Sequence, residues 1–235
     1  MIRIKNFTVP ITTKYTELQP HLSKIMEFKP FLKWQANIAS QDLSQIKINQ
    51  IIVQDVDYFG SRIGFVKFKV DMTWLDGTPL PGIVFCRGDA VAILVILQSA
   101  DLKKVVMVQQ PRLPIGSMGF SELPAGMLDD SNSFVGTAAQ ELKEETGLVI
   151  EHDELVHLNT LAPSPGGCDE YLGLYYVEKE METSEILELE GKVCGLREHG
   201  ERISLKLVDF EELYSSKSLP VLAAVALYKK HKNIM

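Results

Sequence analysis

The sequence has few cysteines and no long apolar run, and each absence argues against a class of protein. The three cysteines, Cys86, Cys168 and Cys194, are scattered, and no two have the CxxC spacing. This pattern argues against a disulfide framework or a zinc site and indicates reduced thiols. The longest apolar run, residues 90–97, is too short to cross a bilayer, and residues 1–17 lack the apolar core of a signal peptide. We therefore expect a cytoplasmic protein that does not enter the membrane.

Positive charge is also scarce. The 235 residues include 24 Lys and Arg against 31 Asp and Glu, for a net charge of −7 and a pI of about 5.3. Binding nucleic-acid phosphates requires clustered basic residues. The one run that stands out, Lys229 to Lys232, is better explained as cations at the C-terminal end of a helix. The five histidines lack metal-ligand spacing, and neither an HExxH motif nor a serine nucleophile elbow occurs. These features argue against a nucleic-acid partner, a histidine-based metal site and a serine hydrolase.

The hydrophobic pattern divides the chain into a smaller N-terminal part and a larger remainder. Residues 16–43 carry helical apolar spacing, divided at Pro30, and residues 46–72 alternate with a period of two around a glycine-containing turn. A helix and a hairpin with one buried face are too thin to bury both faces of the sheet alone. We predict an N-terminal helix-plus-antiparallel-sheet region over residues 1–85 and a second domain over residues 86–235.

The second domain is predicted to contain a mixed sheet. Residues 90–97 read AVAILVIL, which is typical of a central strand covered on both faces. Further strands are predicted at residues 105–109, 155–161, 171–177 and 203–208. Two well-marked helices accompany them, an acidic one at residues 138–146 and a C-terminal one from residue 219. The predicted fold class is therefore α/β, an α/β/α sandwich around a mixed sheet.

The acidic helix is the strongest indication of chemistry. Its apolar stripe, which can pack on a sheet, consists of Val135, Ala138, Ala139 and Leu142. On the opposite side Glu141, Glu144 and Glu145 crowd three carboxylates together, which costs roughly a few tenths of a kcal/mol per like-charge pair. Oxygen ligands without His or Cys suit Mg²⁺, which takes one or two carboxylates, waters and substrate phosphate oxygens. Acidic faces are also common on solvated helices, so the helix alone leaves both interpretations open.

The residues around this helix resemble the Nudix box of the Nudix hydrolases. The matching residues are Gly126, Glu141, Leu142, Glu144, Glu145, Gly147 and Leu148. Two positions depart from the family pattern. Asn132 stands where the box has a loop Glu, and Gln140 stands where it has an Arg that holds a catalytic Glu in place. Because Gln140 can hydrogen-bond but cannot form an ion pair, the supporting half of the box is weakened while the metal-binding half is retained.

A wider resemblance points to the ADP-ribose and ADP-sugar pyrophosphatase branch of this family, and within it to the plant-type ADP-sugar diphosphatases. The segments that carry it are VDYFGSRIGFVKFK, PGIVFCRG, ELPAGMLDD, FVGTA, SPGGCDE and GLREHGE. The resemblance implies the Nudix fold. It also implies hydrolysis of the diphosphate linkage of nucleoside diphosphate sugars, with ADP-ribose and ADP-glucose as leading substrates and AMP and a sugar phosphate as products.

The resemblance also implies the metal site. The cofactor would be Mg²⁺, with Mn²⁺ as a substitute, held by Glu141, Glu145 and the carbonyl oxygen of Ala125. Glu144 would be a further ligand and one of the catalytic glutamates, and Gly126 would make the tight turn into the loop.

Because the helix carboxylates are committed to metal, the general base is expected outside the helix. The position that matches the family's base is Glu201, just before the last predicted strand, and Glu198 is the fallback. Both positions are also compatible with a solvated loop residue.

Four residues are candidates for substrate binding. Arg112 matches a family position for a substrate-binding Arg and, like Arg87, is suited to binding phosphate oxygens. Glu122 belongs to the E-x-P-A-G segment that leads into the box, and Glu170 is suited to accepting hydrogen bonds from sugar hydroxyls. Aromatic candidates for stacking on the base are Tyr58, Phe59, Trp74 and Phe120.

The resemblance implies a homodimer, because the N-terminal sheet of related enzymes pairs with a second subunit. Residues 1–85 would then serve in dimerisation and contribute to the substrate site. Two alternatives stay open. The losses at Asn132 and Gln140 allow a Nudix-fold protein that binds or senses a nucleotide sugar without turning it over. A UDP-sugar diphosphatase is the other, because the sequence does not place the residues of the base pocket.

Overall fold

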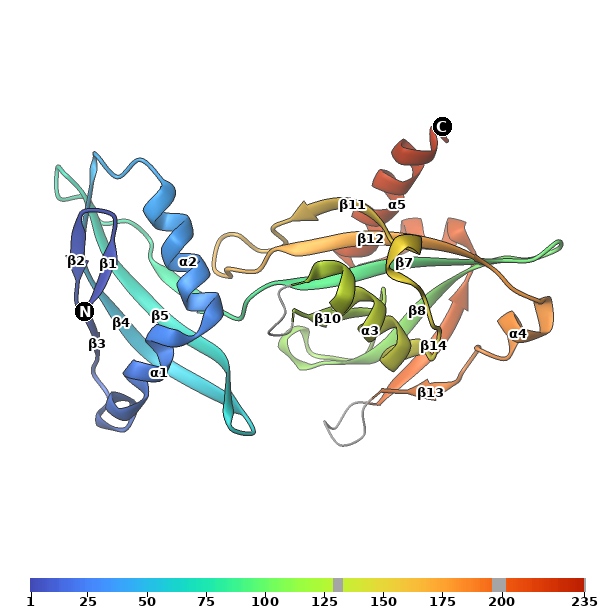
Figure 1. Ribbon diagram of the computed structural model, residues 1–235, viewed down its shortest axis with the longest axis horizontal. Helices are drawn as coiled ribbons and strands as arrows, with labels where there is room; N and C mark the ends of the chain where they lie inside the picture. The colour runs from blue at the N-terminus through green and yellow to red at the C-terminus, as the bar shows by residue number, and fades with distance from the viewer. Residues whose placement is uncertain (129–132, 196–201, 235) are drawn as a thin grey trace. The chain divides into compact units, whose positions relative to one another are not determined.

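The chain folds into two compact units. The computed structural model describes residues 1–128, 133–195 and 202–234. Residues 1–89 and 164–170 make the first unit, and residues 90–163 and 171–235 make the second. Each unit has its own sheet (Figure 1). Each also has its own buried hydrophobic residues. No helix within the described ranges is long and apolar enough to cross a bilayer.

The first unit is built on a four-stranded sheet with the order β3-β4-β5-β6. Its strands are β3 (Ile11–Thr13), β4 (Ile46–Phe59), β5 (Arg62–Trp74) and β6 (Ile83–Cys86). They pair antiparallel, except that β3 runs parallel to β4. A separate two-stranded hairpin consists of β1 (Ile2–Ile4) and β2 (Phe7–Val9). The residues that alternate with a period of two therefore form the predicted hairpin, β4 and β5.

Helices pack on one face of this sheet. They are η1 (Thr16–His21), α1 (Leu22–Glu27) and α2 (Lys29–Ser40). The predicted helical stretch is therefore divided into three, because Phe28 is extended between α1 and α2 and Pro30 lies in the first turn of α2. Phe31 of α2 is fully buried and packs edge-on against Phe68 of β5, with 5.4 Å between the ring centroids.

The second unit is built on an eight-stranded mixed sheet (Figure 1). The main strand order is β11-β12-β7-β8-β14-β13, with β10 paired to β7 and β9 paired to β8. The strands are β7 (Ala90–Gln98), β8 (Lys103–Arg112), β9 (Ser117–Glu122), β10 (Ala125–Met127), β11 (Val156–Leu161), β12 (Leu172–Glu180), β13 (Val193–Cys194) and β14 (Ile203–Val208). The central strand β7 runs parallel to β12 and antiparallel to β8, which makes the sheet mixed, as predicted.

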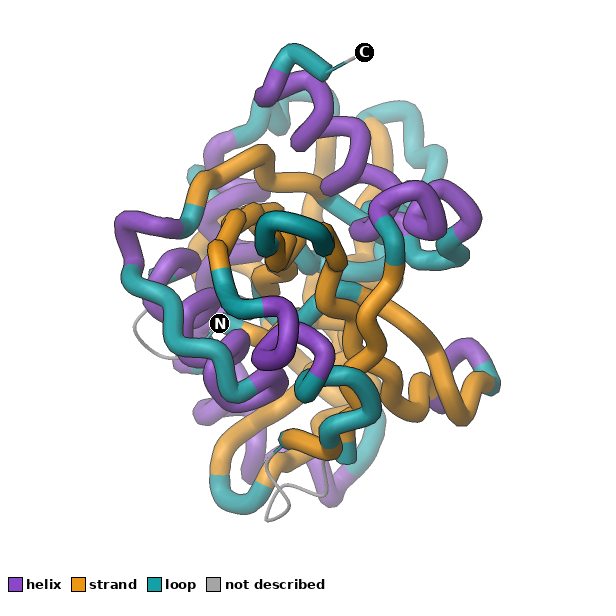
Figure 2. Tube along the Cα trace, turned by 90° about the vertical axis from the view of Figure 1, so that its right-hand side faces the viewer, coloured by secondary structure: helices purple, strands orange, loops and turns teal. Residues whose placement is uncertain are grey.

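Helices cover both faces of this sheet. They are α3 (Phe134–Thr146), α4 (Thr183–Leu187), η5 (Phe210–Ser215) and α5 (Leu219–Lys232), with short 3₁₀ turns at η2 (Leu113–Ile115) and η3 (His152–Glu154). Helix α5 leads to the C-terminus marked at the top of Figures 1 and 2.

Strand β7 shows why the sheet needs two covering layers. Its odd-numbered residues, Val91 to Leu97, enter the core that α3 and α4 cover, and its even-numbered residues, Ala90 to Ile96, enter the core that η5 and α5 cover. Because strand side chains alternate between faces, a continuous apolar run is what a doubly covered strand requires. The predicted α/β/α sandwich is confirmed.

Candidate metal and substrate site

Helix α3 carries three of the candidate glutamates and is fixed at both ends. Ser133 is its N-cap, and the Ser133 hydroxyl accepts the N–H of Gly136 at 3.1 Å. At the other end Gly147 adopts the left-handed conformation at φ 79°, and its N–H donates to the carbonyl of Lys143. The helix begins four residues before the predicted start and ends where predicted.

The predicted apolar stripe holds α3 on the sheet. Ala138 and Leu142 are fully buried in the core that contains Val91 and Ile93 of β7, and Val135 and Ala139 are partly buried beside them. This packing sets the position of the glutamates on the same helix relative to strand β10, which pairs with β7.

Two of these glutamates meet the backbone of β10. Glu145 is only 4% exposed, and its Oε2 accepts the N–H of Ala125 at 2.9 Å. The carboxylate of Glu141, one turn earlier, lies beside Gly126, and a Cβ at Gly126 would overlap it. Ala125 and Gly126 pair with Ala92 and Val91 of the central strand, so the sheet fixes the backbone that these carboxylates approach.

Position 126 requires a glycine because a side chain there would overlap the Glu141 carboxylate. The resemblance implied a tight turn at this residue, but Gly126 lies within β10 and is not among the glycines with positive φ. The absence of a side chain is what allows the Glu141 carboxylate to lie against the strand.

Glu144 has a different partner. Its Oε1 accepts a hydrogen bond from Nε2 of Gln140 at 2.9 Å, so Gln140 holds Glu144 through a neutral hydrogen bond where the family pattern has an Arg. Across residues 1–128, 133–195 and 202–234, no three acidic, His or Cys side chains cluster at metal-binding distance. The structure therefore brings Glu141 and Glu145 to one stretch of backbone and does not bring all three glutamates to one point.

The donors present at β10 fit a hard divalent cation. They are the carboxylates of Glu141 and Glu145 and the carbonyl of Ala125, and all are oxygens. Mg²⁺ is usually bound through one or two carboxylates and completes its shell with waters and substrate oxygens. Two carboxylates and one backbone carbonyl satisfy that requirement without a third acidic residue.

Arg112 and Glu122, predicted to bind substrate, form an ion pair in the second unit. Nε of Arg112 is 2.7 Å from Oε1 of Glu122, and the two residues come from the paired strands β8 and β9. Burial raises the pKa of the Glu122 carboxyl, and the charge and hydrogen bond of Arg112 lower it in part. Glu122 therefore binds the Arg112 guanidinium group. Glu122 itself precedes Ala125, the proposed metal ligand, by three residues in the chain.

Arg87 and Glu170 lie together in the first unit. Nη1 of Arg87 is 3.5 Å from Oε2 of Glu170, and the guanidinium carbon lies 5.8 Å from the ring centroid of Phe65. Nε of Arg87 is buried and has no hydrogen-bond partner among the described residues. A buried donor without an acceptor carries a free-energy cost of about 1–3 kcal/mol, which a bound anion would relieve.

Three residues of the predicted site lie outside the described residues. They are Asn132, Glu198 and Glu201. The assignment of Glu201 as general base, with Glu198 as fallback, therefore stays a prediction.

The aromatic candidates for base stacking lie in both units. The hydroxyl of Tyr58 is 2.7 Å from Nδ1 of His21, Phe59 packs on Phe65 at 4.9 Å, and Trp74 is 45% exposed. These three belong to the first unit, and Phe120 belongs to the second.

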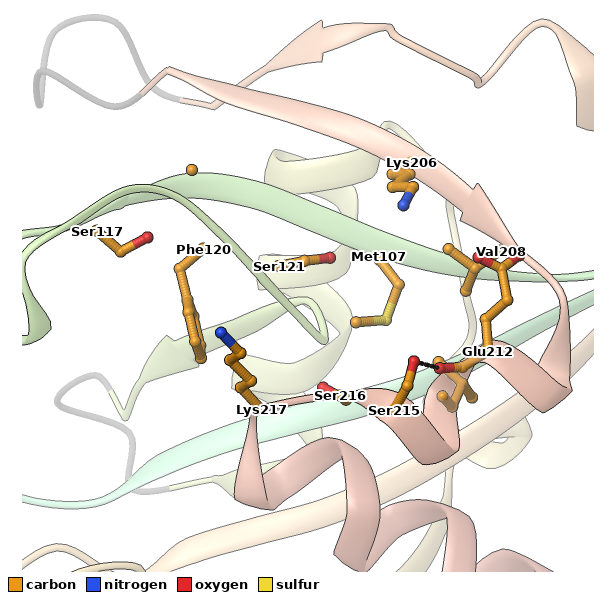
Figure 3. A pocket seen from close by; sticks show the side chains of 12 residues that line it. Met107, Ser117, Phe120, Ser121, Lys206, Val208, Glu212, Ser215, Ser216 and Lys217 are labelled. Atoms are coloured by element: carbon orange, nitrogen blue, oxygen red, sulfur yellow. Dashed lines mark hydrogen bonds between the residues drawn. The ribbon is translucent and has the colours of Figure 1, made fainter.

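A separate pocket of about 330 Å³ opens in the second unit between strands β8, β9 and β14 and helix η5 (Figure 3). Its lining includes Phe120, Ser121, Lys206, Glu212 and Lys217, and the Lys217 side chain points toward Phe120 (Figure 3). None of the predicted metal ligands lines this pocket. Its walls come from residues 107–121 and 206–217, two distant segments of the chain, which leaves no local pattern from which to predict it.

The second unit is an α/β/α sandwich in which the acidic helix α3 places Glu141 and Glu145 against strand β10. A model of the NUDIX domain matches residues 87–225. The chain therefore belongs to the Nudix hydrolase family, whose members generally use divalent metal ions.

Several known proteins are similar to the chain. Nudix hydrolase 14, chloroplastic, of Arabidopsis thaliana is 40% identical over 215 residues, which cover 85% of this chain and 69% of the plant protein. The ADP-ribose pyrophosphatase of Bacillus subtilis (strain 168) is 33% identical over 130 residues, which cover 55% of this chain and 67% of the bacterial protein. The methanol dehydrogenase activator of Bacillus methanolicus is 32% identical over 179 residues, or 74% of this chain and 92% of the activator.

A solved structure shares the fold. The crystal structure of an ADP compounds hydrolase matches 83% of this chain and 100% of its own, with a TM-score of 0.58 and 14% sequence identity. At this level of identity the match is informative about the fold alone.

Proposed function

We propose that the chain hydrolyses the diphosphate linkage of nucleoside diphosphate sugars, preferably ADP-ribose or ADP-glucose, to AMP and a sugar phosphate in a Mg²⁺-dependent reaction. The observation that carries this proposal is the convergence of Glu141 and Glu145 on the backbone of Ala125 and Gly126. The preference for ADP-sugars is supported by the sequence segments of the pyrophosphatase branch and by the name of the Bacillus subtilis relative.

The residues have distinct parts in this reaction. Glu141, Glu145 and the Ala125 carbonyl would hold the metal, with Glu144 as a further ligand beside them. Bound Mg²⁺ supplies charge neutralisation at the diphosphate oxygens and makes water a better nucleophile. The N–H of Ala125 fixes the orientation of the Glu145 carboxylate at 2.9 Å, and this holds its position before the substrate arrives.

Substrate binding is assigned to the two arginines. Arg112 is held by Glu122 through Nε, which directs the rest of its guanidinium group away from that carboxylate toward a phosphate. Arg87 is assigned to an anionic group of the substrate because its buried Nε has no acceptor among the described residues. Glu170, next to Arg87, is assigned to sugar hydroxyls.

Mg²⁺ removal is expected to abolish AMP release. The assay measures AMP from ADP-ribose, ADP-glucose and the matching UDP-sugars, with Mg²⁺, with Mn²⁺ and with excess EDTA. Glu141→Gln is expected to lower kcat/KM about 100-fold or more, because a neutral amide is a poor ligand for a hard cation.

The same panel separates the alternatives. Release of UMP in preference to AMP would make the chain a UDP-sugar diphosphatase. Tight binding of ADP-ribose by calorimetry with no AMP formed would make it a nucleotide-sugar binding or sensor protein, the alternative that the departures at Asn132 and Gln140 leave open.

We also propose a homodimer formed through the sheet of the first unit. The face of β5 and β6 opposite the helices carries Ile83 and Phe85, which are 59% and 37% exposed, and Phe59 of β4 is 43% exposed beside them. Exposed apolar side chains gathered on one sheet face are typical of an interaction surface. Light scattering at micromolar concentration is expected to give twice the 26.3 kDa mass of one chain, and a monomer would contradict the proposal.

A further inference from the structure

Asp169 joins two segments of the first unit that lie far apart in the sequence. Its Oδ1 accepts the backbone N–H of Arg87 at 2.8 Å, and both of its carboxylate oxygens lie 3.3 Å from the backbone nitrogen of Gly88. Its Oδ2 accepts a hydrogen bond from Sγ of Cys86 at 3.2 Å. One carboxylate therefore takes donors from three consecutive residues.

The local backbone is shaped to receive this carboxylate. Gly88 adopts the left-handed conformation at φ 87°, which favours glycine, and the N–H groups of Gly88 and Arg87 both donate to the Asp169 carboxylate. A Cβ at Gly88 would also meet the ring of Pro30. Burial, and then the charge of Asp169, raises the pKa of the Cys86 thiol, so the thiol stays protonated and remains a donor.

Main-chain pairing holds the same two segments side by side. The N–H of Phe85 donates to the carbonyl of Gly167 at 2.7 Å, and the N–H of Asp169 donates to the carbonyl of Phe85 at 3.4 Å. Both of these main-chain hydrogen bonds involve Phe85. The next three residues, 86–88, are instead bound by the side chain of Asp169.

We infer that Asp169 is a positioning residue that sets how Arg87 and Glu170 meet the substrate, an inference that rests on the proposed function. Asp169 binds the main chain of Arg87 directly, and Glu170 is the next residue in the chain. The two side chains are 3.5 Å apart, so displacement of either segment separates the pair and moves the buried Nε of Arg87. The carboxylate of Asp169 acts through these neighbours, because its own oxygens are engaged by residues 86–88.

Asp169→Asn is expected to raise KM for ADP-ribose about tenfold and to change kcat by less than about twofold. The amide keeps one acceptor oxygen but loses the charge and the second acceptor, which weakens the bonds to two backbone N–H groups. The kcat is retained because the hydrogen bonds of the Asp169 carboxylate go to residues 86–88 and not to the proposed metal ligands Glu141 and Glu145. Asp76→Asn is the matched control, because Asp76 also accepts a backbone N–H, from Thr78 at 2.8 Å, in an exposed turn of the same unit. It is expected to leave KM unchanged.

Two further measurements distinguish positioning from general loss of structure. If Asp169 acts through Arg87, the effects of Asp169→Asn and Arg87→Gln on KM will not add in the double variant. Additive effects, or a fall in kcat at unchanged KM, would overturn the inference. Hydrogen exchange at the amides of Arg87 and Gly88 is expected to accelerate at least tenfold in Asp169→Asn. Because exchange is measured without substrate, unchanged exchange would refute the role of Asp169 even if the chain hydrolyses no ADP-sugar.

Discussion

Gly126→Ala is expected to lower kcat/KM for ADP-ribose about 100-fold while the protein stays folded. The new methyl group would occupy the space of the Glu141 carboxylate, which is the end of a flexible side chain and can rotate away. Glu141 is then displaced from the stretch of backbone where the metal is expected. A misplacement of about 1 Å at a reactive centre can cost about 100-fold in rate, or roughly 2.7 kcal/mol of transition-state stabilisation.

The control for this variant is Gly119→Ala. Gly119 lies in β9 of the same sheet, and the nearest atoms to a Cβ there belong to the side chain of Gln109, at an ordinary contact distance of 3.5 Å or more. Both variants replace a strand glycine, so changes in strand propensity affect them alike. AMP release and thermal unfolding are measured for both proteins. A Gly126→Ala protein with normal kcat/KM, or one that loses activity only because it unfolds, would contradict the spatial role of Gly126.

Helices and strands that follow from the pattern of neighbouring residues could be predicted from the sequence. The alternation of β7 between two cores follows from an unbroken apolar run, and the packing of α3 follows from four apolar residues at helical spacing. The end of α3 at Gly147 follows from the lack of a Cβ in the left-handed conformation. In each case the residues that carry the signal are neighbours in the chain.

Contacts between distant segments were not predictable in the same way. The carboxylate of Asp169 reaches residues 86–88 across more than 80 positions, and the loop at residues 164–170 belongs to the first unit. No local periodicity encodes such a contact, because it depends on the pairing of Phe85 with Cys168. Likewise, the sequence showed three crowded glutamates but not that Glu144 bonds to Gln140.

The arrangement of the glutamates bears on which residue can act as the general base. Glu145 is buried and bound to the Ala125 N–H, and Glu141 is confined beside Gly126, so both are held where the proposed metal site requires them. Glu144 is engaged by Gln140. A base must be able to take a proton from water during the reaction, and carboxylates fixed at a cation are poor acceptors. This favours a glutamate from outside helix α3.

Glu201→Gln is therefore expected to lower kcat about 10²–10⁴-fold, the usual contribution of a general base, with little change in KM. The amide preserves size and hydrogen bonding but cannot accept the proton. Glu198→Gln is the matched control, three residues away in the same chain segment, and is expected to keep most of the activity. A large loss in Glu198→Gln with normal activity in Glu201→Gln would transfer the role to Glu198. Full activity in both would return it to Glu144, the helix glutamate that is held by a neutral residue and not by an arginine.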